Sequence, residues 1–318
     1  DLIADESMVV TVTNTGYIKR ISTEEYRVQK RGGKGLKGME TREEDYVTDL
    51  FTASTKTMLL VFTDKGKVYW CKVHKLPLGS RTSKGKSLAN VVQLAAGEKV
   101  RAILPVDEFS ENKHVVMLTE KGIIKKTVLE DFSRPRVSGV NAITINEGDE
   151  LLAARLTDGN HEVMMAVKSG RAIRFPEDKV RPTGRGAIGV YGIEVDDQND
   201  EVVGLAVVGK EDKSKTILVV SQQGFGKRTA IDEYRITNRG GKGVKTININ
   251  VPRGISNGDQ MRYDNVLDNG TLIVEFRVAP HLHFDRRGND LYSNQHISVL
   301  DLIAGGSFNF TTISGKTV

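Results

Sequence analysis

The residues of this chain that could do chemistry are cations set among glycines. The clearest group is the segment Gln29-Lys30-Arg31-Gly32-Gly33-Lys34-Gly35, and a weaker copy spans Thr237 to Gly243. Glycine lets a backbone approach a ligand closely, and lysine and arginine supply positive charge, so such loops suit phosphate groups. We therefore expect electrostatic recognition of a nucleic-acid backbone.

Further cations recur at two places in the chain. One set follows a turn glycine, and the other lies close to a second glycine in a loop. The first set is Lys19, Arg20, Lys67, Lys125, Lys126, Arg171, Arg174, Lys227 and Arg228. The second set is Arg81, Lys84, Lys86, Arg134, Arg136, Arg181, Arg185, Arg239 and Lys242. A single charge run is usually just a solvated face, but repetition at equal positions predicts one curved positive band that contacts duplex DNA through phosphates.

The elements that must position these cations form a repeat. Each unit is an apolar, β-branched run, a polar turn that ends in glycine, and a return strand, which is typical of a β-hairpin. The turn glycines are Gly16, Gly66, Gly122, Gly170 and Gly224, and the second glycines are Gly35, Gly85, Gly139, Gly189 and Gly243. Spacings of 50, 56, 48 and 54 residues between turn glycines, with about four strands per unit, predict an all-β, bladed fold.

The repeat stops near residue 250. No turn glycine of the expected pattern follows near residue 275, and only Lys316 follows Lys245 among the lysines, although the chain as a whole carries a net charge of +5. We expect two domains, residues 1–250 and 251–318, and a tail that is still β-rich. The exposed edges of an incomplete last blade would invite pairing with another strand.

Several kinds of site and location are disfavoured. Cys71 is the single cysteine, which excludes an intrachain disulfide and suits a cytoplasmic protein. No apolar run reaches the ~18 residues of a membrane span. The first residues lack the order of a signal peptide and read as the continuation of an upstream segment.

No cofactor, metal or catalytic residue is expected. The segment Gly184 to Gly189 is a literal GxGxxG, but it lacks the preceding strand and following helix of a dinucleotide site. Gly79 to Ser87 misses the spacing of a phosphate loop. His281, His283 and His296 have no cysteine partner and read as loop histidines.

Residues 1–250 resemble the C-terminal domain of the A subunit of DNA gyrase. The segment Gln29 to Gly35 is similar to that family's gyrase box, with Lys30 where arginine is common. The related protein of topoisomerase IV usually has a degenerate box, so the intact box favours gyrase. The resemblance implies a β-pinwheel, a propeller-like disc whose neighbouring blades exchange strands, with four full blades and a partial fifth here against the family's usual six.

The same resemblance implies a function and partners. The family wraps duplex DNA around the rim with positive handedness, which supports negative supercoiling, while ATP hydrolysis and DNA cleavage lie in other parts of the enzyme. This chain is then no enzyme on its own. Its partners are double-stranded DNA, the remainder of gyrase A, and gyrase B.

Residues from about 245 to 318 resemble part of the C-terminal region of DnaJ-type co-chaperones. The resemblance rests on Val251 to Ile255, Gly270 to Val274, His281 with Phe284, and Gly288 to Tyr292, with Leu282 where proline is usual. It implies a short β-sandwich-like segment. The alternative function that follows is a protein-interaction module that binds unfolded polypeptides, without stimulation of a partner ATPase, because the J-domain and zinc repeats of that family are absent.

Overall fold

The computed structural model divides the chain into two compact units, Asp1–Thr246 and Ile247–Val318. It describes residues 2–25, 45–80, 82–195, 199–220, 226–245, 251–267, 270–305, 307, 309–314 and 316–317. Each unit is treated separately below.

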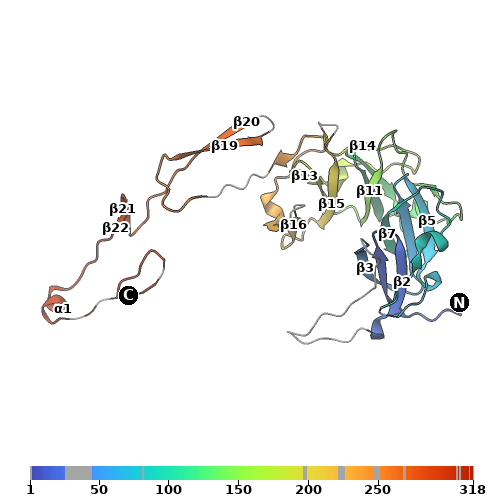
Figure 1. Cartoon of the computed structure of the whole chain (residues 1–318), viewed down its shortest axis with the longest axis horizontal. Coiled ribbons are helices and arrows are strands. Elements are labelled where there is room, and N and C mark those ends of the chain that lie inside the picture. The colour runs from blue at the N-terminus through green and yellow to red at the C-terminus, as the bar shows by residue number, and fades with distance from the viewer. Residues whose placement is uncertain are drawn as a thin grey trace. The chain divides into compact units, whose positions relative to one another are not determined.

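The first unit contains four antiparallel sheets of four strands, which Figure 1 shows following one another in chain order from the blue β2 to the yellow β15. A hairpin forms the middle of each sheet. The hairpin strands are β1 (Ser7–Thr13) with β2 (Tyr17–Ser22), β4 (Met58–Thr63) with β5 (Lys67–Lys72), β8 (His114–Thr119) with β9 (Ile123–Val128), and β12 (His161–Val167) with β13 (Arg171–Pro176). These are the hairpins that the turn glycines predict, and Gly16, Gly66, Gly122 and Gly170 all have positive φ.

A third strand pairs with the first strand of each hairpin. These strands are β3 (Val47–Ser54), β7 (Val100–Val106), β11 (Leu151–Thr157) and β15 (Val202–Gly209). Strand β11 contacts both β7 and β15, which lie in the neighbouring sheets. This side of each sheet therefore faces the adjacent blades, and we call these the inner strands.

The fourth strand of each sheet is contributed by the next unit of the repeat. For example, β6 follows β5 in the chain but pairs with β2 of the first sheet, in the register Tyr17 to Ser87. These outer strands are β6 (Lys86–Ser87), β10 (Val140–Asn141), β14 (Val190–Tyr191) and β18 (Val244–Lys245). The exchange of strands between neighbours confirms the expected β-pinwheel.

A short 3-10 turn follows the hairpin of every unit. These turns are η1 (Thr23–Glu25), η2 (Val73–Lys75), η4 (Leu129–Phe132), η5 (Glu177–Lys179) and η6 (Ile231–Glu233), and a further turn, η3 (Leu88–Asn90), follows β6. From the second unit onward, the chain leaves the turn and runs back along the preceding blade.

The hydrophobic core lies between adjacent blades. One cluster, around Val10 and Leu59, joins the first and second blades, and another, around Phe62 and Met117, joins the second and third. A third joins the third and fourth blades. The continuous apolar runs of strands such as β4 and β8 explain this arrangement, because a blade that lies between two others is covered by a neighbour on both faces.

Among the described residues, the fifth unit forms a two-stranded sheet, the hairpin of β16 (Thr216–Val220) with β17 (Gly226–Ala230). Its cluster with the fourth blade buries only Met164, Val208 and Ile231 among the described residues, and Leu218 in β16 is 65% exposed. The chain thus has four full blades and a partial fifth, as expected, and the last blade is held by far less buried apolar surface.

The second unit contains two further hairpins and one short helix. They are β19 (Gln260–Leu267) with β20 (Gly270–Glu275), β21 (Asp285–Arg287) with β22 (Asp290–Tyr292), and α1 (Val299–Ile303). Its described residues form two separate two-stranded sheets rather than the packed layers of the sandwich-like segment that we expected, and none whose burial is described is buried. None of the described helices of the chain has the length and apolar character needed to cross a membrane.

Candidate nucleic-acid interface

Four loops related to the expected box run along the outer edges of the blades. They are residues 79–85, 133–139, 183–189 and 237–243. The first of them lies against β2: the amide of Gly79 donates to the carbonyl of Arg20 at 3.0 Å, and the loop ends where β6 pairs with Tyr17 and Ile18. Equivalent parallel bridges join Lys126 to Pro182 and Arg174 to Ile236.

The second glycine of the repeat is the point of closest approach between loop and strand. Gly85 has a φ of +74°, and a Cβ there would lie 2.4 Å from the carbonyl oxygen of Ile18. Gly189 has a φ of +109°, and its Cβ would lie 2.6 Å from the carbonyl oxygen of Ile124. Only glycine fits these positions, because a side chain meets both an unfavourable φ and a rigid backbone.

Buried lysines donate hydrogen bonds to the backbone of two of these loops. The ammonium of Lys19 donates to the carbonyls of Ser80 at 3.0 Å and Ser83 at 2.9 Å, and Lys19 is 0% exposed. In the third blade, the ammonium of Lys125 donates to the carbonyls of Ala142 at 2.6 Å and Arg185 at 2.8 Å. Each lysine thus fixes the backbone of a loop that belongs to the following unit.

Burial has an electrostatic cost for these lysines. Loss of solvent lowers the pKa of Lys125 to about 8, because the charged form loses hydration that the protein only partly replaces. Burial also lowers the pKa of Lys19, against the opposing charge of Glu25. The carbonyl oxygens around each ammonium offset part of that cost, because they accept hydrogen bonds from it.

The second and fourth blades fill this place differently. In the second blade, the ring of Tyr69 lies directly under Gly139, whose Cβ would be 2.7 Å from the ring. In the fourth blade the equivalent residue is the apolar Ile173, and Arg171, two residues earlier, donates to the carbonyl of Lys242 at 3.1 Å and pairs with Asp200 at 3.2 Å. Every full blade therefore supports the loop that follows it, although the chemistry varies.

One residue further along, a second donor holds the 3-10 turn of the next unit. Arg20 donates to the carbonyl of Leu76 at 3.0 Å, just after η2, and the indole of Trp70 donates to the carbonyl of Phe132 at 2.8 Å. Lys126 donates to the carbonyl of Glu177 at 3.0 Å. Arg174 donates to the carbonyl of Ile231 at 2.6 Å and pairs with Glu162. We call these four side chains the clasp residues.

Arg228 occupies the clasp position of the fifth unit. It is exposed, and no partner for its guanidinium is found among the described residues. This follows from the topology, because the clasp acts on the turn of the next blade and the fifth hairpin has no such neighbour among the described sheets.

The expected positive band is therefore divided into two layers. Lys19, Lys125, Lys126, Arg171 and Arg174 are buried, and a fully buried charge cannot reach a phosphate. Exposed cations lie instead on the loops and the outer strands. They are Lys84, Lys86, Arg134, Arg136, Arg181, Arg239 and Lys242, with Arg185 partly exposed.

The remaining predicted residues fall into two groups. Lys227 and Arg228 are exposed on β17, while Arg20 and Lys67 are partly buried on β2 and β5. The box itself, Gln29 to Gly35, and Arg81 lie outside the described residues, so DNA contact through them stays a prediction. The glycine pattern at Gly184 to Gly189 is followed by strand β14. Sequence analysis had rejected a dinucleotide site here because no helix was expected after the pattern.

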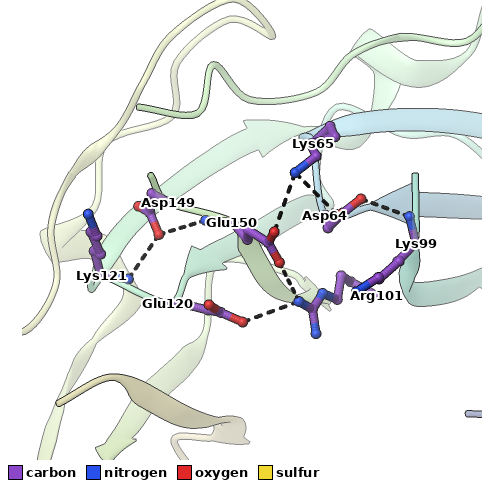
Figure 2. Close-up of polar contacts among 8 residues, drawn as sticks. All are labelled: Asp64, Lys65, Lys99, Arg101, Glu120, Lys121, Asp149 and Glu150. Carbon is purple, nitrogen blue, oxygen red and sulfur yellow. Dashed lines mark hydrogen bonds and ion pairs between the residues drawn. The ribbon is translucent and has the colours of Figure 1, made fainter. Parts of the chain in front are cut away.

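A polar network with several carboxylates marks a different part of the blades, at the turns between hairpin strands. Figure 2 shows Arg101 reaching between Glu120 at 3.2 Å and Glu150 at 2.6 Å, with Lys65 also paired to Glu150 at 3.3 Å. The Arg101 hydrogen bond is the largest of the effects that lower the pKa of Glu150. These pairs join the second and third blades beside the inner strands, and their carboxylates disfavour a phosphate path there.

Sequence reasoning missed the supporting role of the buried cations. In different units, an exposed cation and a buried cation lie at the same distance after their turn glycines, as Lys227 and Lys125 do. The signal that could have separated them is Trp70, because a tryptophan at a clasp position indicates that the side chain there packs against another part of the fold.

Comparison with known proteins agrees with this geometry. Residues 7–54, 57–107 and 113–158 each match the model of the DNA gyrase C-terminal domain, beta-propeller family, and these segments coincide with the first three blades. The model of the DnaJ C terminal domain matches residues 162–318. That second match begins inside the fourth blade, earlier than the expected start near residue 245.

Curated relatives are gyrase proteins. The A subunit of DNA gyrase from Chlamydia muridarum is 41% identical over 277 residues, which cover 86% of this chain and 32% of that protein. The A subunit of DNA gyrase from Staphylococcus aureus (strain NCTC 8325) is 43% identical over 255 residues, 80% of this chain and 28% of that protein. The chain spans about a third of the length of these relatives.

Solved structures show the same architecture. A crystal structure of the C-terminal domain of DNA topoisomerase IV superposes with a TM-score of 0.65 at 25% identity, covering 86% of this chain and 85% of that one. A DNA gyrase A C-terminal domain superposes with a TM-score of 0.61 at 26% identity, covering 75% and 76%. The first three blades of this chain therefore match the DNA gyrase C-terminal domain, beta-propeller family, and its C-terminal part is similar to the DnaJ C terminal domain.

Proposed function

We propose that the blades, up to the boundary near residue 250, bind and bend duplex DNA as a non-catalytic module of a cytoplasmic type II topoisomerase of the gyrase kind. The observation that carries this proposal is the repeated pairing of an exposed cationic loop with a buried donor beneath it. Lys84 above Lys19 and Arg185 above Lys125 are two instances.

The buried donors make the loops suitable for DNA binding. A loop whose carbonyls are already bonded keeps its shape when a ligand arrives, so less conformational entropy is lost on binding. The exposed cations then contact phosphates without reading bases, which suits wrapping of any sequence. Smooth bending of DNA costs roughly 1–6 kcal/mol per 20–30 base pairs, and contacts on successive blades would offset it.

The rest of the enzyme supplies the chemistry. We propose that the remainder of gyrase A, together with gyrase B, are the partners, and that this module directs the DNA so that strand passage introduces negative supercoils. The box residues Gln29 to Gly35, which belong to the first unit of the repeat, would contact DNA phosphates in the same way as the described loops.

The test is salt-dependent DNA binding by a loop variant. The variant K84A/K86A removes two exposed cations of one loop, so the slope of log K against log salt should fall by up to about 2. The control K56A/K113A removes two exposed lysines that lie in turns away from these loops. Equal slopes for the two variants would contradict the assignment of the loops as the interface.

A second test addresses the box. The variant K30A/R31A/K34A should weaken bending of a short duplex, measured by energy transfer between dyes at its ends, and should also flatten the salt dependence of binding. Bending equal to that of the wild-type chain would remove the box from the mechanism.

The match to the DnaJ C terminal domain supports a second candidate function, binding of unfolded polypeptide by the second unit. A hollow of about 890 Å³ in that unit is lined by apolar residues that include Pro280, Leu282 and Phe284, together with polar and charged residues such as Asp285 and Arg286. The chain should then slow the aggregation of a denatured client protein, and L282D should lose that effect. V137D, a change at an exposed apolar residue of the first unit, is the control. No effect of the wild-type chain would reject this function.

A further inference from the structure

The fourth blade departs from the repeat at one buried position. The residue that opens the 3-10 turn is aliphatic and buried in three units, as Val73, Leu129 and Ile231. In the fourth unit it is Glu177, which is 0% exposed. The equivalent residue of the first unit, Thr23, is not buried. A carboxylate in a position that three units fill with a buried aliphatic side chain needs a compensating partner.

The partners of Glu177 within the described residues are incomplete. Its Oε1 accepts a hydrogen bond from the amide of His161 at 3.3 Å, whereas its Oε2 is buried and has no hydrogen-bond partner. Lys126 donates to the backbone carbonyl of Glu177, not to its carboxylate. An unpaired buried oxygen of this kind destabilises the folded chain, because it loses hydration without gaining a hydrogen bond.

Two further ligand groups face this carboxylate. Ligand atoms of Asp158, His161 and Glu177 all lie within 4.8 Å of one another. His161 Nδ1 is 2.8 Å from Asp158 Oδ1, a hydrogen-bond distance, and the two atoms would move apart to about 3.4 Å as neighbouring ligands of a tetrahedral metal with bond lengths of about 2.1 Å. The Asp158 and His161 side chains are 58% and 24% exposed, so a cation can arrive from solvent.

A second imidazole lies beside the cluster. His114 opens β8, and its backbone pairs with Thr157, the residue before Asp158. Its Nδ1 is buried without a hydrogen-bond partner among the described residues. This imidazole lies outside the group of ligand atoms that are within 4.8 Å of one another, so it neighbours the cluster without being one of its three ligands.

We propose that Asp158, His161 and Glu177 bind a divalent transition-metal cation such as Zn²⁺. Mixed imidazole and carboxylate ligands suit zinc and its first-row neighbours. The ion would satisfy the buried oxygen of Glu177 and join the loop before β12 to η5. Sequence analysis predicted no metal, and Asp158, His161 and Glu177 follow no recognised spacing of metal ligands.

The test is a Co²⁺ titration of the full chain after chelator treatment. One saturating ion with a visible absorption band that Zn²⁺ displaces is expected, and Zn²⁺ at a hundredfold excess over Kd should raise Tm by about 5 °C. A chain that shows neither the band nor the shift would overturn the proposal, leaving Asp158 and His161 as a simple ion pair.

Two variants locate the ion. E177L introduces the aliphatic residue found at the equivalent position, Leu129, so it should fold while Co²⁺ affinity falls by at least about tenfold. H281N/H283N removes exposed histidines of the second unit and should leave the titration unchanged. If E177L keeps the wild-type affinity, or if only the tail variant loses the signal, the site is not the one proposed.

Discussion

Replacement of Lys125 by methionine tests the idea that buried cations support the DNA-facing loops. Methionine keeps most of the length of the side chain but donates no hydrogen bond. The carbonyls of Ala142 and Arg185 would then lose their donor, at about 1–3 kcal/mol for each. Removal of a desolvated ammonium offsets part of that loss, so we expect K125M to lower the free energy of unfolding by about 1 kcal/mol near pH 7.

The pH dependence has a definite sign. The pKa of Lys125 falls from its ordinary value of 10.5 to about 8 in the folded chain. Between these two values the unfolded chain binds more protons than the folded chain, so the contribution of Lys125 to stability rises with pH. The linkage relation gives about 2 kcal/mol between about pH 7 and about pH 9.5, which we reduce to about 1 kcal/mol for solvent screening near the loop.

The assay is urea unfolding of wild type and K125M, followed by the fluorescence of Trp70, the single tryptophan, which lies between the second and third blades. The stability difference should grow from about 1 to about 2 kcal/mol over that pH range. K113M, at an exposed lysine, should change stability by less than about 0.5 kcal/mol at both pH values. A difference that shrinks with rising pH would refute the reasoning.

Two further predictions concern the fold. R174M should destabilise the chain by about 3 kcal/mol in urea unfolding, because it leaves the buried carboxylate of Glu162 unpaired, whereas R228M should cost less than about 0.5 kcal/mol at the same position of the fifth unit. Equal effects would show that the clasp does not depend on a following blade. G189A should lower the free energy of unfolding by at least about 2 kcal/mol. G184A should leave it unchanged, since a Cβ at Gly184 meets no atom within 4 Å. Unchanged stability of G189A would contradict the close approach of loop and strand.

Much of the fold could be predicted because it depends on local pattern. Alternating apolar runs and a turn glycine specify each hairpin, and the period near 50 residues implies repeated blades. The end of the repeat was also visible, since no turn glycine follows Gly224 at the expected distance. The tail was harder, because its short strands bury too little apolar surface to specify how they pack.

The candidate interface could be predicted only in part. Charge and position predicted cations on a rim, and Lys84 and Lys242 are indeed exposed there. The same reasoning put Lys19 and Lys125 on that rim, although both are buried. Their burial depends on loops that lie much further along the chain. Ser83 is 64 residues after Lys19, and Arg185 is 60 residues after Lys125.

The sequence alone determined the all-β repeat, the hairpins, the second glycines and the presence of many cations, because each depends on neighbouring residues. Only the tertiary structure decided which cations face solvent and which hold a loop, because strand exchange brings each return strand under a segment of the next unit. It also decided that Glu177 lies buried beside His161 and Asp158. Side chains of equal charge therefore have different roles according to what the next blade places over them.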